Sequence, residues 1–282
     1  MSPAASLAID AELAMPEFRA IAAMLQDEAR ITLGEAKVTL VQSRLAKRLR
    51  EHGLGSYRDY LRLVRDDEVE RGVMVTALTT NHTHFFREKH HFDHLVSDVL
   101  PKLRTRKAPV RIWSAGCSSG EEVYSIAMCL LGQNAADANW LRTADVRLLA
   151  TDISQPMVEA VRRAVYPEIA ADAVPLAFRG RWMQEAPGGV QVGEQARSLV
   201  SARVLNLFDP WPMQRQFDVI FCRNVMIYFD EPAKRELEER LIRQLVPGGF
   251  LYIGHSERLG RAEEQGMRSC GQTIYRKDEA TA

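Results

Sequence analysis

The chain is poor in cysteine and has no long apolar run. Its four cysteines, among 282 residues, form no C-x-x-C pair and no spacing typical of a disulfide framework. No apolar stretch approaches the roughly 20 residues that span a bilayer. The first residues lack the basic region of a secretory signal. We therefore expect a cytoplasmic protein without membrane insertion, with a flexible N-terminus over residues 1–15.

An excess of positive charge is also absent. Lysine and arginine number 37, as do aspartate and glutamate, so the formal net charge is zero. Proteins that bind nucleic acids over a large surface are usually basic, and no nucleic-acid partner is expected here. Hydrophobic residues at 46% are typical of a soluble globular protein, and the length permits two domains.

Apolar spacing in the first third of the chain is helical. Apolar residues recur at intervals of three and four, as in Phe18, Ile21 and Leu25. Ser56 is placed to cap one helix, and Asp66 or Asp67 to cap the next, which runs to Leu78. We predict a small all-helical domain over residues 16–92.

After Pro109 short apolar runs alternate with helical patterns, which is typical of βαβ units and a parallel sheet. The sequence thus predicts a Rossmann-like α/β domain over residues 93–282. A break over about 167–204 predicts a small antiparallel β insertion, with a hairpin turn at Pro187-Gly188-Gly189 between strands 178–183 and 190–192. The other predicted strands are 110–114, 146–150, 217–222, 250–254 and a closing run at 272–277, and the predicted helices are 119–131, 155–164 and 232–245.

The segment Arg111-Ile-Trp-Ser-Ala-Gly-Cys-Ser-Ser-Gly-Glu-Glu122 places two glycines between a predicted strand and a predicted helix. Ligands of open α/β sheets bind beyond the carboxyl ends of the strands, and glycine there lets a ligand approach the backbone. The lysine of a phosphate-binding loop is absent. Glu121 and Glu122 would repel a pyrophosphate and suit a cation such as S-adenosylmethionine. The alternative is an ordinary tight turn between strand and helix.

A second signal, Thr151-Asp-Ile153, ends the next predicted strand. Asp152 is placed there to accept hydrogen bonds from ribose hydroxyls. Asp152 or Ser154 could also cap the following helix, and both interpretations can hold together. The two signals together are more specific than either alone.

Four segments resemble the chemotaxis-receptor glutamate O-methyltransferases, the CheR family. They are Asn81-His-Thr-His-Phe-Phe-Arg87 with the residues to Phe92, Trp113 to Ser125, Cys222-Arg-Asn-Val-Met-Ile-Tyr-Phe229, and Gly254-His-Ser-Glu257. The resemblance runs in the right order from about Phe18 to Tyr275. It implies transfer of a methyl group from S-adenosylmethionine to glutamate side chains of chemoreceptors, with S-adenosylhomocysteine as the other product.

The resemblance also implies the residues that contact the cofactor. Asn81, Thr83 and Arg87 would reach the methionine end, and Glu122 would take its ammonium group. Asp152 would bind the ribose. The remaining contacts would be Asn206 and Leu207 around the adenine, and Arg223 and Asn224 lining the pocket.

Methyl transfer to a carboxylate needs no general base, because a free glutamate with a pKa of about 4.3 is ionised at neutral pH. The enzyme must supply alignment and exclusion of water. Tyr228 is the candidate catalytic residue, because by resemblance its hydroxyl faces the transferred methyl group. The alternative is an aromatic packed beside Phe229. A further basic residue of the family could be replaced here by Lys102 or Arg104.

Arg44, Lys47 and Arg48 form a basic helical face. It is either a solvated surface or the docking surface for the acidic helices of a receptor. The β insertion offers an edge strand on which a receptor C-terminal tail peptide could pair. We expect the protein to be a monomer.

Five of the seven histidines fall between His82 and His94. His90 and His94 have the spacing of helical metal ligands, but no H-E-x-x-H pattern or cysteine accompanies them. Surface or capping histidines are expected, and no metal.

Two other functions remain open at this point. The first is a methyltransferase with a different acceptor. The N-P-P-[FY] run of many amino-methylating enzymes is replaced by Asn224-Val-Met-Ile-Tyr228, which disfavours amine chemistry. The second is a regulatory module that senses S-adenosylmethionine or its demethylated product without turning it over.

Overall fold

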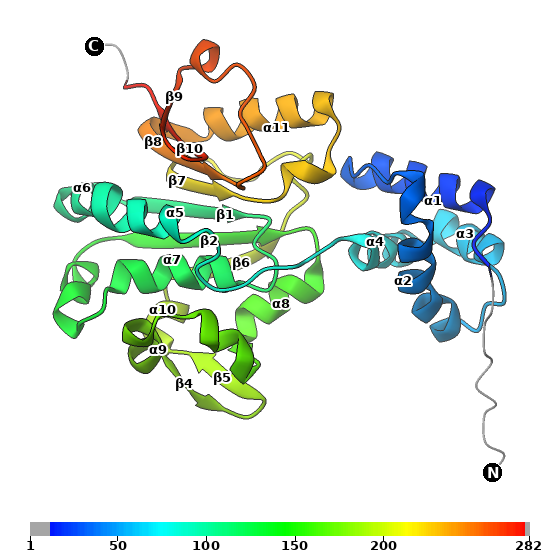
Figure 1. Ribbon diagram of the computed structural model, residues 1–282, viewed down its shortest axis with the longest axis horizontal. Helices are drawn as coiled ribbons and strands as arrows, with labels where there is room; N and C mark the ends of the chain where they lie inside the picture. Colours follow the sequence, from blue (N-terminus) through cyan, green and yellow to red (C-terminus); the bar gives the residue numbers. More distant parts are fainter. Residues whose placement is uncertain (1–11, 280–282) are drawn as a thin grey trace. The chain divides into compact units, whose positions relative to one another are not determined.

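The computed structural model describes residues 12–279, and its backbone contacts divide the chain into two compact units. The first unit comprises the residues up to Thr80 together with Tyr228–Asp230, and the second comprises the rest. Figure 1 colours both along the sequence. Of the flexible segment expected at 1–15, residues 1–11 lie outside the described residues. The expectation is wrong for the last part, because Leu13 is buried and a helix begins at Met15.

The first unit is helical, as the apolar spacing predicts. Both predicted N-caps are confirmed: the Ser56 hydroxyl accepts the backbone N–H of Asp59, and the Asp67 carboxylate accepts those of Val69 and Glu70. The unit's elements are α1 (Met15–Ala29), the 3-10 turn η1 (Glu35–Lys37), α2 (Val38–Glu51), α3 (Tyr57–Asp66) and α4 (Glu68–Leu78).

The segment Tyr228–Asp230 belongs to this first unit although it lies far along the chain. Phe229 forms an isolated antiparallel bridge with Ile31. The N–H of Thr32 donates to the carbonyl of Tyr228 at 2.9 Å. The chain therefore leaves the second unit for this short segment and then returns to it.

The second unit is built on a seven-stranded sheet in the order β6-β2-β1-β7-β8-β10-β9 (Figure 1). Strands β6, β2, β1, β7 and β8 are parallel; β10 pairs antiparallel with β8, and β9 pairs antiparallel with β10 at the edge of the sheet. The predicted parallel sheet and the predicted closing strand are confirmed. The bounds are β1 (Val110–Ala115), β2 (Val146–Asp152), β6 (Val200–Val204), β7 (Phe217–Cys222), β8 (Leu245–Ile253), β9 (Met267–Gly271) and β10 (Ile274–Lys277).

The strand order gives the sheet a topological switch point between β1 and β7. From β1 the chain moves outward through β2 to β6, and from β7 it moves the other way to β8. Right-handed crossovers then place α7 (Glu121–Leu131) and α8 (Gln155–Arg163) on one face and α11 (Glu231–Arg243) on the other. Ligand sites of such sheets lie at the switch point, outside the carboxyl ends of the strands.

The remaining helices of the unit precede β1 or fill loops. The buried side chains of α5 and α6 join those of α7 and α8 in one apolar cluster with the sheet. Within residues 12–279, no helix has both the length and the apolarity to cross a bilayer. The helices that precede β1 are α5 (Lys89–His94), the π-helix η2 (Leu95–Val99) and α6 (Leu100–Thr105). The 3-10 segments in loops are η3 (Ala135–Arg142), η5 (Met226–Tyr228) and η6 (Glu263–Gln265).

The β insertion is present, with two corrections. Its sheet has the order β3-β5-β4, and the predicted hairpin turn at Pro187-Gly188-Gly189 joins β4 to β5. Residues 200–204, expected within the insertion, form β6 of the main sheet. The elements are β3 (Val165–Tyr166), η4 (Glu168–Ala173), α9 (Leu176–Trp182), β4 (Met183–Ala186), β5 (Gly189–Val192) and α10 (Glu194–Arg197).

The strand predicted over 178–183 is wrong, because most of that segment is helix α9. Phe178 and Trp182 are both buried, and their spacing of four places them on one helical face. Phe178 stacks on Phe86, and the indole N–H of Trp182 donates to the carbonyl of Gly132 at 2.7 Å.

The domain boundary expected at residue 92 lies instead between Thr80 and Asn81. The reason is packing: Phe85 and Phe92 are buried in the apolar cluster of the second unit. The N–H of Phe86 also donates to the hydroxyl of Ser125, on α7, at 2.9 Å. The signature segment beginning at Asn81 is therefore part of the methyltransferase unit.

Candidate active site

The carboxyl ends of the parallel strands bring together most of the predicted site. Asp152 ends β2, Gly116 follows β1, and Arg223 and Asn224 follow β7. Asn206 lies just beyond β6. Because these strands are parallel, their carboxyl ends share one edge of the sheet, as an open α/β site requires.

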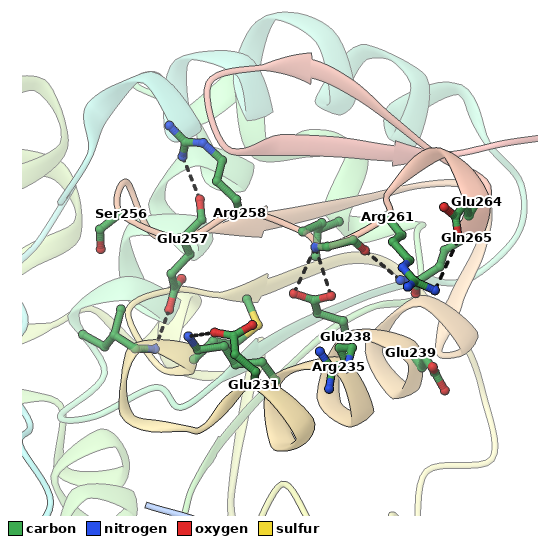
Figure 2. Close-up of a pocket in the computed structure, with 15 residues that line it drawn as sticks. Glu231, Arg235, Glu238, Glu239, Ser256, Glu257, Arg258, Arg261, Glu264 and Gln265 are labelled. Atoms are coloured by element: carbon green, nitrogen blue, oxygen red, sulfur yellow. Dashed lines mark hydrogen bonds and ion pairs between the residues drawn. The ribbon is translucent and has the colours of Figure 1, made fainter. Parts of the chain in front are cut away.

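A groove of about 600 Å³ begins at the same edge, beside the segments that follow β7 and β8 (Figure 2). Met226 and Ile227 line its start, and the polar face of α11 forms one wall. Two buried carboxylates, Glu238 and Glu257, point into this region. The groove thus adjoins the predicted pocket on the β7 and β8 side.

The glycine turn after β1 packs against the protein itself. Gly116 has φ +76°, and a Cβ there would lie 2.4 Å from Cγ2 of Val225. Gly120 has φ +101°, and its Cβ would lie 2.9 Å from Cγ2 of Val161. Glycine was expected to admit a ligand. The structure shows that these positions need glycine for their positive φ and for close internal packing.

Asp152 joins the turn after β1 to the turn after β2. Its Oδ2 accepts the N–H of Ser118 at 2.8 Å, and its Oδ1 accepts the N–H of Ser154 at 2.9 Å. Burial raises the pKa of this carboxyl, and the backbone hydrogen bonds oppose that shift. The N-cap of α8 is Ser154, so Asp152 does not serve as that cap.

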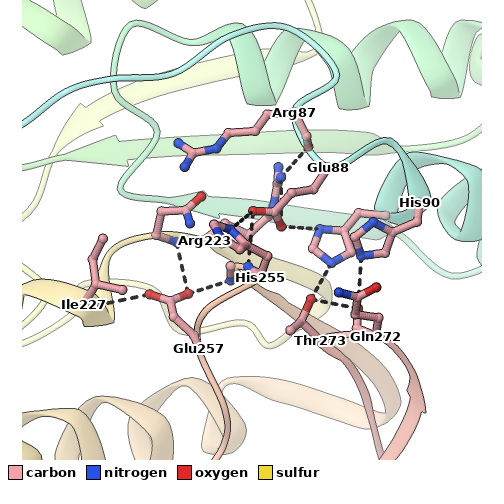
Figure 3. Close-up of polar contacts among 12 residues, drawn as sticks. Arg87, Glu88, His90, Arg223, Ile227, His255, Glu257, Gln272 and Thr273 are labelled. Atoms are coloured by element: carbon pink, nitrogen blue, oxygen red, sulfur yellow. Dashed lines mark hydrogen bonds and ion pairs between the residues drawn. The ribbon is translucent and has the colours of Figure 1, made fainter.

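Glu122 and Arg223 form a buried ion pair. Nη1 of Arg223 lies 2.9 Å from Oε2 of Glu122, and the hydroxyl of Ser114 donates to Oε1 at 2.7 Å. Arg223 also pairs with Glu88 at 3.3 Å and donates to the carbonyl of Arg87. Its side chain is 2% exposed. Arg223 therefore connects the signature segment after Thr80 to the helix that follows the glycine turn (Figure 3).

Glu88 and Glu257 are functional candidates that the sequence reasoning did not assign. Glu88 accepts the backbone N–H of His255 at 3.2 Å, besides its ion pair with Arg223 (Figure 3). Glu257 accepts the N–H of Asn224 at 3.0 Å. Both carboxylates lie in segments quoted for the family resemblance, and those segments were the signal that could have identified them.

The other predicted contacts occupy this unit as follows. The carbonyl of Asn81 accepts the Ser118 hydroxyl at 2.8 Å, and Arg87 donates to the carbonyl of His82 at 3.0 Å. Thr83, which lies between Asn81 and Arg87 in the sequence, is half-buried. The N–H of Leu205 donates to the carbonyl of Asp152 at 3.0 Å, and buried Leu207 follows shortly after. Asn206 accepts the N–H of Phe208 at 3.1 Å.

Tyr228 ends the 3-10 turn η5 and is half-buried, whereas its neighbour Phe229 is buried. Its side chain therefore does not share the full burial of Phe229. The basic residues considered as its assistants lie on α6. Lys102 stands over the ring of Phe250, and Arg104 donates to the carbonyl of Asp137 in η3, ahead of β2. Neither of these contact partners belongs to the predicted pocket.

Arg44, Lys47 and Arg48 do not form one solvated basic surface. Arg44 donates to the carbonyls of Leu78 and Thr79, both at 2.7 Å, and so caps the C-terminus of α4. Arg48 pairs with buried Glu70. Lys47 alone among the three projects outward, with a side chain that is 74% exposed.

The histidines between His82 and His94 are not all the surface or capping residues that were expected. His91 is fully buried and lies 2.9 Å from the hydroxyl of Thr273, and His94 lies 2.8 Å from that of Tyr252. Burial, with the charge of Arg223, lowers the pKa of His91 to about 3. In the described part of the chain, no three His, Cys, Asp or Glu side chains are grouped to hold a metal ion.

Five parallel strands with the buried acids Glu122 and Asp152 at their carboxyl ends, bordered by β10 and β9, form the Rossmann-like methyltransferase domain that the sequence predicts. Comparison with family profiles gives the finer identification. Residues 16–79 match the profile described as CheR methyltransferase, all-alpha domain. Residues 81–276 match that described as CheR methyltransferase, SAM binding domain. The chain belongs to the CheR methyltransferase family, as predicted, and the expected enzyme class, a methyltransferase dependent on S-adenosylmethionine, is confirmed.

Similarity to curated proteins extends over nearly the whole chain. A probable chemotaxis protein methyltransferase of Rhizobium etli is 42% identical over 264 residues, which cover 90% of this chain and 96% of the relative. Chemotaxis protein methyltransferase 2 of Pseudomonas aeruginosa is 40% identical, with 87% of each chain covered. The chemotaxis protein methyltransferase of Escherichia coli is 36% identical, with 92% of this chain and 89% of the relative covered.

Proposed function

We propose that this protein transfers a methyl group from S-adenosylmethionine to glutamate side-chain carboxylates of a bacterial chemoreceptor, giving methyl esters. The observation that carries the proposal is the buried set Glu122, Asp152 and Arg223 at one edge of the parallel sheet. Relatives named chemotaxis protein methyltransferases support the receptor as acceptor. We further propose that it works in the cytoplasm as a monomer.

The donors and acceptors at this edge fit S-adenosylmethionine. The carboxylate of Asp152 accepts backbone N–H groups from Ser118, Ser154 and Ile153, and its two oxygens have about four lone-pair positions, which leaves room for a ribose hydroxyl. Glu122 offers negative charge for the ammonium group, and Arg87 is able to bind a carboxylate bidentately. Asn206 and Leu207, just beyond β6, would bracket the adenine. Asn81, Thr83, Arg223 and Asn224 complete the set proposed to line the pocket.

The bound cofactor would supply an electrophilic methyl group. The acceptor glutamate is already ionised at neutral pH, so this chain need not provide a base. Its contribution is alignment and exclusion of water, and alignment alone can supply roughly 7–11 kcal/mol in favourable cases. Tyr228 is proposed as the catalytic residue, with its hydroxyl directed to the transferred methyl.

Two surfaces are proposed for the receptor. Lys47 is the remaining candidate of the predicted basic face for docking on acidic receptor helices, since Arg44 and Arg48 are engaged within their own unit. The short strand β4 lies at the edge of the insertion sheet, where a receptor tail peptide could add a strand.

The deciding experiment is transfer of radiolabelled methyl from S-adenosylmethionine to receptor-bearing membranes, followed by mild alkali. Label that appears on the receptor and leaves as volatile methanol is expected, because carboxylate methyl esters hydrolyse in alkali. Label that resists alkali would indicate an amine acceptor. Binding of S-adenosylmethionine without any labelled product would support the sensing module.

A further inference from the structure

The carboxylate of Glu257 gathers backbone N–H groups from the two loops that follow β7 and β8. Its Oε2 accepts the N–H of Asn224 at 3.0 Å and that of Gly254 at 2.5 Å. Its Oε1 accepts the N–H of Ile227 at 3.3 Å, and Met226 contributes a further backbone hydrogen bond. Figure 3 shows Glu257 between these loops. One side chain thus ties together two segments at the candidate active site.

The backbone held by Glu257 is not a conformation that a chain adopts by default. Asn224 has φ +58°, in the left-handed region that is sterically unfavourable for most residues. Gly254 packs so closely that a Cβ would lie 2.4 Å from Nδ2 of Asn224. The N–H groups of this turn must point inward together, and a single acceptor with two oxygens meets that requirement.

Packing alone does not account for a carboxylate at this position. Glu257 is 5% exposed, and among the described residues its carboxylate is bonded to backbone N–H groups, whereas the guanidinium of Arg258 donates to its main-chain carbonyl. Burial raises the pKa of its carboxyl, while the N–H groups of Gly254 and Asn224 oppose the shift. Burying a charge without a counter-ion is costly unless hydrogen bonds offset the cost.

We propose that Glu257 is a positioning residue for methyl transfer, acting through the turn from Asn224 to Tyr228. Glu257 fixes the direction in which the chain enters the turn η5, and hence the position of Tyr228 at the end of that turn. The inference rests on the proposed function and adds to it a residue that sets the geometry of the acceptor side. Misplacement of a reacting group by about 1 Å can reduce a rate on the order of 100-fold, so a side chain of this kind affects turnover strongly.

The chain provides a matched control in Glu238, on α11. Glu238 is also buried, burial also raises the pKa of its carboxyl, and it also accepts a backbone N–H, that of Gly260 at 3.1 Å. Both glutamates line the same groove (Figure 2). Among the described residues, the hydrogen-bond donor to the Glu238 carboxylate is the N–H of Gly260, which does not belong to the turn after β7. Comparison of Glu257→Gln with Glu238→Gln therefore separates loss of a buried carboxylate from loss of the turn geometry.

The test measures kcat with receptor membranes, calorimetric affinity for S-adenosylmethionine, and thermal unfolding of both variants. A glutamine offers one acceptor oxygen, so Glu257→Gln leaves part of the turn without a partner. We expect its kcat to fall on the order of 100-fold, while its affinity for S-adenosylmethionine changes by less than about tenfold. Glu238→Gln should lose stability yet keep its kcat. Equal kcat losses in the two variants, or an unchanged kcat in Glu257→Gln, would overturn the inference.

The route through Tyr228 is tested by a double-mutant cycle. If Glu257 acts by placing Tyr228, then Glu257→Gln should reduce kcat much less in a Tyr228→Phe background than in the wild type. Effects that multiply independently would refute that route. If the glutamine variant does not fold, Glu257→Asp replaces it, since aspartate keeps both oxygens but shortens their reach. A wild-type protein without any methyl transfer would instead reject the proposed function, which keeps the two failures distinct.

Discussion

The guanidinium of Arg223 and the carboxylate of Glu122 lie 2.9 Å apart in a buried ion pair that joins the end of β7 to the start of α7. Glu88 holds the same guanidinium from another side at 3.3 Å. The charge proposed for the methionine ammonium is thus shared with a fixed internal cation. A ligand that binds Glu122 therefore meets a carboxylate that is already paired with Arg223, which is itself paired with Glu88.

Glu122→Gln should weaken both the binding of S-adenosylmethionine and the fold. The amide retains a hydrogen bond but removes the charge that faces the ammonium group, so we expect Kd to rise by about 10- to 100-fold, with stability lower by about 1–3 kcal/mol. Calorimetry and urea unfolding give the two quantities. Glu238→Gln, also buried but outside the network, should keep its affinity, and a wild-type Kd for Glu122→Gln would contradict the proposed contact.

Gly116→Ala should destabilise the protein, because the new Cβ meets Val225 at 2.4 Å and the residue keeps φ at +76°. Val225→Ala in the same chain removes the clash and should restore part of the loss, leaving the positive-φ cost of roughly 1–2 kcal/mol. Gly72→Ala is the control, because nothing lies within 4 Å of its Cβ and alanine favours a helix. Thermal unfolding of the four chains measures the effect. If Val225→Ala restored none of the lost stability, the clash with Val225 would not be the cause of the loss.

Glu70→Gln should destabilise the helical unit by about 3 kcal/mol, because Arg48 loses its buried partner. Burial raises the pKa of Glu70, but hydrogen bonds from Arg48, Tyr60 and His52 outweigh burial and bring it below the usual value. The stabilisation contributed by the Glu70 carboxylate is therefore complete above its unfolded-state pKa of about 4.3. It is lost as the pH falls through the lower pKa of Glu70 in the folded protein. The difference between wild type and variant in unfolding free energy should shrink over that range. Glu51→Gln, on the exposed side of Arg48, should cost less than about 1 kcal/mol.

Lys47→Glu should slow methylation of receptor membranes roughly threefold at low ionic strength, because steering by an exposed charge speeds encounter. The effect should fade as salt is added, since screening shortens the range of the charge. Arg62→Glu reverses a comparably exposed cation on α3 of the same unit and serves as the control. Equal effects of the two reversals would argue for net charge and against a docking surface that includes Lys47.

Strands that are buried on both faces were predictable, whereas exposed ones were not. All residues of β7 are buried, and its apolar run predicted its bounds correctly. The burial of β6 is confined mainly to Ala202, so its sequence carries no apolar run and its pairing with β2 was missed. β9 is exposed except for Met267 and was missed for the same reason.

The site residues that end strands could be placed from sequence, because a strand end fixes a position at the edge of the sheet. Partners distant in the chain could not. Helical spacing shows Arg44 and Arg48 on one face, but it cannot show that their acceptors lie at Leu78 and Glu70. The same holds for Glu257, whose partner Asn224 lies in another loop.

The bridge between Phe229 and Ile31 bears on how this chain can be divided. A cut after Thr80 would separate Tyr228–Asp230 from the unit with which it folds. A fragment starting at Asn81 would keep the whole sheet, yet the segment continuing from the turn η5 would have lost its structural support. The helical unit is therefore built from two separate stretches of the chain, and gene fusions or domain exchanges in this family should carry both stretches together.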